Sequence, residues 1–262
     1  MKVKTNGIET NYVVEGEGPW LTMSHSLACN VSMWEQQVKL LAKRFKVLRY
    51  DTRGHGGSGA PKGPYTMDEL ADDAKALFDA LGIRQTHWAG LSMGGMIGQM
   101  FALKYPGVFK SMVLADTTSR RPPNAQQMWS DRVRTAREKG MEGVVEGTLG
   151  RWFTEGYRQS RKDVMERIGS DIRATPVEGF AGCCEAIGKI DVLDRLKEIK
   201  CPTLVIMGEE DHGTPPEAAK LIAANIPGAE LVIIPSAAHL SNVEQADAFN
   251  KALASFYDRV AK

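Results

Sequence analysis

Short apolar runs alternate with amphipathic helical stretches over most of this chain, and the alternation restricts the folds open to it. Strand patterns that take turns with helical stripes predict a mostly parallel sheet whose strands are joined by crossover helices. One helix is expected to start at a capping box of Thr66 and Glu69, and the last one near Val243, behind a second capping box of Ser241 and Glu244. The strand-like runs are, in chain order, GIETNYVVEG, PWLTMSH, FKVLRYD, QTHWAGLS, VFKSMVLAD, PTLVIMG and AELVIIP.

The alternation fails between Thr117 and Lys200, where helical, arginine-rich segments with many glycines take its place. The simplest account is an α/β core, formed by residues 1–117 and 200–262, into which an α-helical segment, residues 118–199, is inserted. A chain of 262 residues with 43% hydrophobic residues can bury a full core of this kind.

Composition and charge exclude several classes of protein. The formal net charge of +1 gives no electrostatic case for binding nucleic acid or an anionic membrane. No apolar run approaches the roughly 18 residues of a membrane-spanning helix, and the first residues lack the apolar stretch of a signal peptide. The four cysteines and five histidines show neither C-x-x-C nor H-E-x-x-H spacing, which predicts reduced thiols in a cytoplasmic protein and no metal site.

The stretch DTRGHGGSG, residues 51–59, has the glycine spacing of a dinucleotide-binding loop at Gly54, Gly56 and Gly59. Such a loop requires the third glycine to open a helix whose N-terminus receives the pyrophosphate. Here APKGPY follows, and two prolines with a glycine between them cannot start that helix at once. The loop therefore does not predict a nucleotide cofactor, and the chain implies no other cofactor.

The stretch HWAGLSMGGM contains G-x-S-x-G, from Gly90 to Gly94, between an apolar strand and a helix. In a tight strand-turn-helix only small residues fit two positions before and after the serine, and the turn exposes its hydroxyl at the carboxyl edge of the sheet. The alternative interpretation is a glycine-rich turn with an incidental serine, but the context favours Ser92 as a nucleophile. The N–H groups of Met93 and of Leu27, in the loop after PWLTMSH, are the predicted donors to a developing oxyanion.

A serine nucleophile needs a base and an orienting acid, which in this arrangement follow it in the order Asp or Glu, then His. Of the two later histidines, His239 follows the last strand-like run, whereas His212 directly follows the acidic run GEED and is expected to be a loop residue. Asp211, just after PTLVIMG, is the predicted acid. Asp116, after MVLA, is the alternative, because an acid can also reach the site from that strand end.

With SHSLA, YDTRGHGGS, GLSMGG, GEEDHGTPP and AAHLSNVE in that order, the chain resembles the α/β-hydrolases over essentially its whole length. Within that family it is most similar to the 3-oxoadipate enol-lactonases of aromatic catabolism, and the segments RWFT and GFAGCCEAI carry the finer match. Both segments lie in the insertion, which resembles the cap of the family. Ser26 and Ala28 depart from the family pattern, which commonly has a glycine in this part of the oxyanion loop.

The resemblance implies a serine hydrolase that acts on a small lactone or ester through an acyl-enzyme on Ser92, without a cofactor. The expected reaction opens 3-oxoadipate enol-lactone to 3-oxoadipate. Another carboxylesterase or lactonase and a cofactor-free perhydrolase would keep the same three residues, and a ligand-sensing receptor would keep only the fold. The sequence does not fix the oligomeric state, and a homo-oligomer is compatible with it.

A carboxylate on the substrate requires a cation in the pocket, preferably the fork of an arginine. In QQMWSDRVRTAREKG, Arg132 lies within an apolar helical stripe that includes Trp129, and we expect both to face the substrate. Arg151 and Trp152 of RWFT are the further candidates for substrate binding. The alternative for Arg132 is a structural pair with a nearby acid.

The segment GFAGCCEAI also raises a rival nucleophile, because small residues stand two positions before and after Cys184. No strand-like run precedes it, and the surrounding pattern is helical. A packing role is therefore expected for Cys183 and Cys184.

Overall fold

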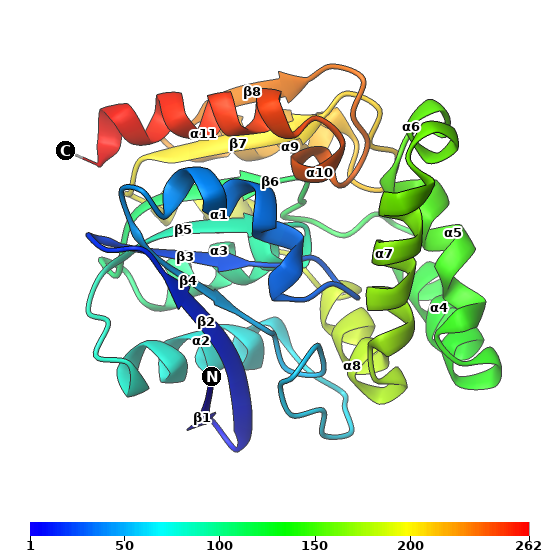
Figure 1. Ribbon diagram of the computed structural model, residues 1–262. Helices are drawn as coiled ribbons and strands as arrows, with labels where there is room; N and C mark the ends of the chain where they lie inside the picture. The colour runs from blue at the N-terminus through cyan, green and yellow to red at the C-terminus, as the bar shows by residue number, and fades with distance from the viewer. Residues whose placement is uncertain (262) are drawn as a thin grey trace.

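The computed structural model describes residues 1–261 and shows an eight-stranded sheet with helices on both faces (Figure 1). The strands are ordered β1-β2-β4-β3-β5-β6-β7-β8 across the sheet. The β1–β2 and β2–β4 pairs are antiparallel and the other neighbours are parallel, so the prediction of a mostly parallel sheet is confirmed. The strands span Lys2–Thr5 (β1), Ile8–Glu15 (β2), Trp20–Ser24 (β3), Lys46–Tyr50 (β4), Thr86–Leu91 (β5), Phe109–Ala115 (β6), Thr203–Gly208 (β7) and Glu230–Ile234 (β8).

The central strands β5 and β7 are buried along their whole length. Parallel strands with helices on both faces bury both of their sides, which explains why these segments read as continuous apolar runs. Trp88 in the middle of β5 is fully buried and stacks on Phe109 and Phe101, with ring centroids 5.0 and 6.2 Å away. This packing joins β5 to the first residue of β6 and to the helix of residues 93–104.

Helices cover the two faces of the sheet. Helices α1 and α11 pack against each other on one face, and α2 packs against α3 on the opposite face (Figure 1). In residues 1–261, no helix is long and apolar enough to cross a membrane. These helices are α1 (Glu35–Leu41), α2 (Met67–Ala80), α3 (Met93–Lys104), α9 (Pro216–Asn225), α10 (Ser241–Glu244) and α11 (Ala246–Val260), with short 3₁₀ helices at Val31–Trp34 and Leu193–Glu198.

The two predicted capping boxes have different outcomes. Thr66 caps α2, since its hydroxyl accepts the N–H of Glu69 at 3.0 Å, and this start is confirmed. The second capping box is wrong. Ser241 and Glu244 both lie inside the single turn α10, and the Ser241 hydroxyl donates to the carboxylate of Asp116 at 2.6 Å. A tertiary hydrogen bond thus replaces the local one that the pattern suggested.

Five α-helices between β6 and β7 form a layer beyond the carboxyl ends of the parallel strands, at the right of Figure 1. This layer is the inserted α-helical segment expected from the interrupted alternation. Its helices are α4 (Ala125–Lys139), α5 (Glu142–Trp152), α6 (Glu155–Ser160), α7 (Lys162–Ala174) and α8 (Val177–Ile187).

The chain enters and leaves this helical layer through two segments that pair with each other. The N–H of Val192 donates to the carbonyl of Ser119 at 2.8 Å, and the N–H of Arg121 donates to that of Ile190 at 2.9 Å. These two hydrogen bonds hold the entering and leaving segments together, which supports a boundary between the core and the inserted helices at these points. We propose that residues 118–199 form the cap and that the remainder of the chain forms the core.

Helix α8 contacts the core backbone to backbone at the glycine-rich loop after β4. A Cβ at Gly54 would lie 2.5 Å from the Cα of Gly179, and one at Gly63 would lie 2.9 Å from the Cα of Gly182. Only residues without a side chain allow so close an approach. No helix opens directly after this loop, since α2 begins only at Met67. Gly54 and Gly63 allow the close contact with α8, whereas Gly56 and Gly59 face core side chains, those of Asp51 and Ile8.

Gly179→Ala should destabilise the protein, because the added methyl group would overlap the backbone of Gly54. Overpacking of this kind costs about 1–3 kcal/mol, which urea unfolding should show as a lower midpoint. Gly150→Ala in α5 is the matched control. Within the part of the chain that the structure describes, its methyl group meets open space, and alanine should stabilise the helix by about 0.5–1 kcal/mol. Equal midpoints for the two variants would contradict the close contact.

Candidate active site

Ser92 occupies the tight turn between β5 and α3. Its backbone has a φ of 54° and a ψ of −113°, a conformation that residues with a side chain rarely adopt. Space around the turn is equally restricted. A Cβ at Gly90 would overlap the carbonyl oxygen of Gly94, and a Cβ at Gly94 would overlap that of Ser24. The G-x-S-x-G pattern therefore reflects two close backbone contacts, which present the Ser92 hydroxyl at the carboxyl edge of the sheet.

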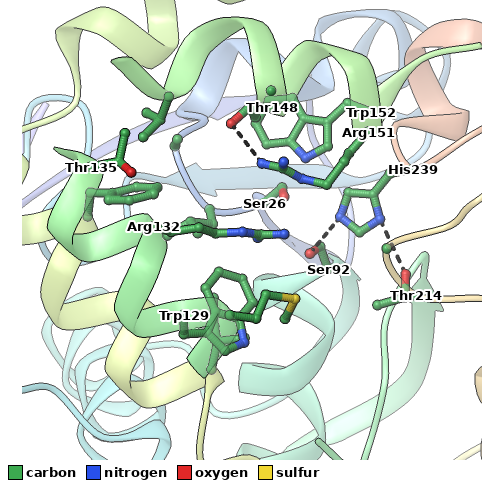
Figure 2. A pocket seen from close by; sticks show the side chains of 18 of the residues that line it. Ser26, Ser92, Trp129, Arg132, Thr135, Thr148, Arg151, Trp152, Thr214 and His239 are labelled. Carbon is green, nitrogen blue, oxygen red and sulfur yellow. Dashed lines mark hydrogen bonds between the residues drawn. The ribbon is translucent and has the colours of Figure 1, made fainter. Parts of the chain in front are cut away.

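His239 and Asp211 lie next to Ser92, although they come from the turns after β8 and β7. Ser92 Oγ is 2.9 Å from His239 Nε2 (Figure 2), and His239 Nδ1 is 2.7 Å from Asp211 Oδ2. All three side chains are buried. The structure thus brings together the serine, histidine and acid named from the sequence, in one chain of hydrogen bonds from carboxylate to hydroxyl.

Thr214 belongs to the same hydrogen-bonded group, although no motif singled it out. Its hydroxyl donates to Asp211 Oδ2 at 2.6 Å and lies 3.2 Å from His239 Nδ1. The N–H groups of Gly213 and Thr214 donate to Asp211 Oδ1 at 2.7 and 3.0 Å. The available signal was the turn-forming run after Asp211, since an aspartate often accepts the N–H groups that follow it in a turn. These donors stabilise the ionised carboxylate and fix its orientation.

The hydrogen bonds of Asp116, the alternative acid, go elsewhere. Its carboxyl group accepts the N–H of Gly208 at 2.8 Å and the hydroxyl of Ser241 at 2.6 Å. Burial, and after it the charge of Asp211, raises the pKa of Asp116 to about 8. Asp116 therefore keeps its proton more readily than Asp211, whose pKa is lowered, and a protonated carboxyl group stabilises an imidazolium less than a carboxylate does. Geometry and ionisation both favour Asp211 as the partner of His239.

Burial disfavours the charged form of His239, but the charge and hydrogen bond of Asp211 outweigh it and raise the pKa of His239 above its usual value near 6.5. The pKa of Asp211 is lowered despite burial, because His239 and Thr214 stabilise its charge. His239 is therefore stabilised as an imidazolium, the form it takes after accepting a proton from Ser92.

Two backbone N–H groups near Ser92 donate to no group within residues 1–261. One belongs to Met93, the first residue of α3, where helix geometry leaves the N–H unpaired. The other belongs to Leu27, in the loop after β3, which lines the same cavity as Ser92. A free donor at each place is what an oxyanion site requires, and we propose that role for both groups.

A cavity of about 250 Å³ lies between this group and the cap. Ser92 and His239 line it from the core, and helices α4 and α5 line it from the cap (Figure 2). Its volume is below the range of roughly 300–1,000 Å³ for drug-sized ligands, which points to a small substrate. The four cap residues expected to contact substrate all line the cavity: Trp129, Arg132, Arg151 and Trp152.

Arg132 and Arg151 direct their guanidinium groups into this cavity (Figure 2). Arg132 lies over the ring of Trp129, 4.3 Å from its centroid, and Arg151 donates to the hydroxyl of Thr148 at 3.3 Å. Burial, and after it the charge of Arg151, lowers the pKa of Arg132 to about 10. Burial also lowers the pKa of Arg151. Two cations thus share a small cavity in which both are partly withdrawn from solvent.

Within residues 1–261, no carboxylate lies within ion-pair distance of Arg132 or Arg151. The outward arginines of α4 differ, because each has an acidic partner. These pairs are Arg134 with Asp131 at 2.7 Å and Arg137 with Glu178 at 3.0 Å. The structural ion pair considered for Arg132 is therefore absent from the described chain, and the charge of Arg132 is not balanced by a neighbouring carboxylate there.

Cys183 and Cys184 are fully buried inside helix α8, where burial raises the pKa of both thiols. Such thiols are poor nucleophiles, in line with the expected packing role. Across the described chain, no group of three or more His, Cys, Asp or Glu side chains is arranged to hold a metal ion.

Comparisons with known proteins agree with this geometry. A family model described as alpha/beta hydrolase fold matches residues 19–246. The chain is 37% identical over 254 residues to 3-oxoadipate enol-lactonase 2 of Acinetobacter baylyi, with 96% of this chain and 94% of that protein covered. The crystal structure of the enol-lactonase from Burkholderia xenovorans LB400 superposes with a TM-score of 0.95 at 39% identity, covering 99% of this chain and 100% of that one. A thermophilic esterase from Thermogutta terrifontis, solved with malate bound, superposes with a TM-score of 0.95 at 31% identity, and 100% of both chains is covered.

Ser92→Ala and His239→Ala should each lower kcat for a nitrophenyl ester by roughly 10³-fold or more, and the double variant should be little worse, because the residues act as a unit. Asp211→Asn should also lower kcat strongly, whereas Asp116→Asn should retain most of it. Circular dichroism checks that each variant is folded. An active Asp211→Asn beside an inactive, folded Asp116→Asn would show that Asp116 is the acid.

The rate should fall at acid pH, since only the neutral imidazole of His239 can accept the proton of Ser92. Because Asp211 raises the pKa of His239, half of kcat/KM should be lost at or above the usual value near 6.5. The positive charge of Arg132 opposes that shift, so Arg132→Met should move the loss to higher pH. A pH–rate profile from about pH 5 to about pH 9 with a neutral ester measures both effects, and a flat profile would refute them.

Proposed function

The chain belongs to the α/β-hydrolase family, and on that premise we propose that it is a serine hydrolase that opens 3-oxoadipate enol-lactone to 3-oxoadipate. One observation carries the proposal. Two guanidinium groups without carboxylate partners, those of Arg132 and Arg151, share a small cavity with the Ser92 hydroxyl. A small lactone with a carboxylate requires both features, a nucleophile for its carbonyl carbon and a cation for its charge.

The first half of the proposed reaction forms an acyl-enzyme. Ser92 Oγ attacks the lactone carbonyl carbon while His239 Nε2, 2.9 Å away, accepts the hydroxyl proton. Asp211 stabilises the imidazolium, and the N–H groups of Leu27 and Met93 stabilise the oxyanion of the tetrahedral intermediate. Collapse of the intermediate breaks the ring C–O bond and expels the enol oxygen, which takes up the proton that His239 carries.

The second half releases the product. The enolate is a better leaving group than an alkoxide, and the enol tautomerises to a ketone. The tautomerisation matters because the leaving group stays tethered to the acyl group and could attack it. As a ketone it is too poor a nucleophile to close the ring again. Water gives a proton to His239 and attacks the ester carbonyl, and His239 returns the proton to Ser92 Oγ as 3-oxoadipate leaves.

Arg132 is the proposed partner of the substrate carboxylate, with Arg151 beside it. The Trp129 ring under Arg132 holds the guanidinium plane by a cation–π contact, so little further ordering is needed on binding. A charge-assisted hydrogen bond made by a partly buried group is stronger than the same bond in solvent. Trp152 stacks beside His239, with ring centroids 6.4 Å apart, and forms the wall next to the base.

The relatives support this substrate class. Two proteins named as enol-lactonases, at 37% and 39% identity, match the chain over nearly its whole length, cap included. The esterase solved with malate shows that a close structural neighbour binds a small dicarboxylate. We further propose that the reaction serves the breakdown of aromatic compounds in the cytoplasm, as the resemblance to the 3-oxoadipate enol-lactonases implies.

Steady-state hydrolysis of 3-oxoadipate enol-lactone, compared with that of nitrophenyl acetate, tests the function directly. The lactone should give the higher kcat/KM, because only it engages the arginines. A preference for the neutral ester would indicate a general carboxylesterase. Binding of the lactone with at most about one turnover per site would indicate a ligand-sensing receptor.

Arg132→Met should raise KM for the lactone strongly, lowering kcat/KM about 10- to 100-fold, because hydrogen bonds between charged groups contribute about 1.5–3 kcal/mol. The same variant should hydrolyse nitrophenyl acetate at nearly the original rate when assayed above the pKa of His239. Arg134→Met is the matched control, since Arg134 is on the same helix but exposed and paired with Asp131. Equal losses on both substrates would show that Arg132 supports the cap instead of binding the carboxylate.

A further inference from the structure

Two buried histidines outside the Ser92 group join the oxyanion loop to the glycine-rich loop after β4. His55, from the glycine-rich loop, accepts the N–H of Ala28 at its Nε2, 2.9 Å away. His25, from the oxyanion loop, accepts the N–H of Thr52 at its own Nε2, also at 2.9 Å. Both side chains are 0% exposed, and their ring centroids are 5.3 Å apart. Each loop thus supplies one histidine acceptor to a backbone N–H group of the other.

The neighbours of the two rings fix their protonation. Nδ1 of His55 is 3.2 Å from the carbonyl oxygen of Arg53, and Nδ1 of His25 is 2.7 Å from that of Ser26. A carbonyl oxygen only accepts, so Nδ1 carries the hydrogen in both rings and Nε2 has a free lone pair. Burial, and after it the charge of His25, lowers the pKa of His55 to about 3, and burial lowers that of His25. Both rings are neutral acceptors.

The N–H that His55 binds is next in the chain to the N–H proposed for the oxyanion. Ala28 has a φ of 56°, in the left-handed region that residues other than glycine avoid. A backbone held there needs an outside restraint, and the hydrogen bond to His55 supplies one. The Leu27 N–H is left without an acceptor within residues 1–261, and it lies in the same short turn, closed by the N–H of Cys29 donating to the carbonyl of Ser26 at 3.2 Å.

We propose that His55 is a positioning residue, which holds the Ala28 N–H so that the Leu27 N–H stays directed toward the oxyanion of the substrate. The inference rests on the proposed function, because it takes Leu27 as an oxyanion donor. It assigns His55 an effect on the transition state, since the oxyanion develops there and is absent from the bound substrate. Loss of the hydrogen bond lowers kcat and leaves KM nearly unchanged.

Two polar replacements of His55 separate this role from packing. Glutamine places its carbonyl oxygen near the position of Nε2 and can accept the Ala28 N–H, whereas asparagine reaches only the position of Nδ1. For nitrophenyl acetate, His55→Asn should lower kcat about 10- to 100-fold and change KM less than about threefold, because a displaced oxyanion donor weakens transition-state binding. His55→Gln should restore most of kcat. Equal kcat values for the two variants would overturn the proposal.

His87→Asn is the matched control for a lost buried histidine. His87 is also neutral, since burial lowers its pKa to about 4, and its Nδ1 is 2.8 Å from Ser111 Oγ, at the far end of β5 from Ser92. Its replacement should lower Tm much as His55→Asn does, while kcat stays within about twofold, because distant sites act independently. Losses of kcat that follow Tm in both variants would mean that His55 is only structural.

Calorimetric binding of phenylboronic acid gives a readout that needs no turnover. The boronate adduct on Ser92 places a charged oxygen where the oxyanion forms, so His55→Asn should weaken its affinity about as much as it lowers kcat/KM. Unchanged affinity in the folded variant would overturn the proposal. Neither this probe nor nitrophenyl acetate carries a carboxylate. A protein that fails only on 3-oxoadipate enol-lactone would therefore refute the proposed substrate and leave the role of His55 standing.

Discussion

The left-handed backbone of Ser92 is the constraint on which the rest of the site depends. Such a conformation costs on the order of 1–3 kcal/mol and persists only where the surroundings leave no alternative. Here β5 is buried between β3 and β6, and the missing side chains of Gly90 and Gly94 let α3 begin against the end of β3. If either element could shift, the turn would relax and the Ser92 hydroxyl would move away from His239. The continuous burial of the central strands is therefore a requirement of the chemistry as well as of stability.

The cap is destabilised by the partial burial of two arginine charges. Arg132 and Arg151 are partly withdrawn from water without a carboxylate to balance them in the described chain, which is unfavourable for a charged group and lowers the pKa of both side chains. The arginines on the outer face of α4 have acidic partners, as the pair of Arg134 with Asp131 shows. The lack of carboxylate partners is thus a property of the arginines that line the cavity. Under the proposed function, the carboxylate of the substrate balances these charges, so their desolvation in the free protein raises the affinity for that substrate.

Patterns in the sequence predicted the features that depend on neighbouring residues or on strand ends. The elbow at Ser92 could be predicted because strand, turn and helix are contiguous, and Asp211 could be placed near His239 because the carboxyl ends of parallel strands share one edge. Features that depend on contacts between distant segments could not be predicted in this way. Helical spacing showed which face of α4 carries Arg132, but only the packing of α4 against α5 and α8 shows that no acid among residues 1–261 pairs with it. Ser241 matched a local capping pattern, yet a hydrogen bond from another part of the chain determined its role.

The glycine-rich loop after β4 shows how one physical property can serve two purposes. A dinucleotide loop needs glycines so that the backbone can approach a pyrophosphate, and here the backbone of Gly54 approaches that of Gly179 in cap helix α8. The same loop carries His55, whose ring accepts the Ala28 N–H on one side and has the thiol of Cys183 from α8 4.0 Å from its Nδ1 on the other. The cap therefore contacts the glycine-rich loop after β4 and also forms walls of the cavity. A substitution in α8 that shifts the helix would therefore reach the loop that holds Ala28 through two contacts, Gly179 with Gly54 and Cys183 with His55.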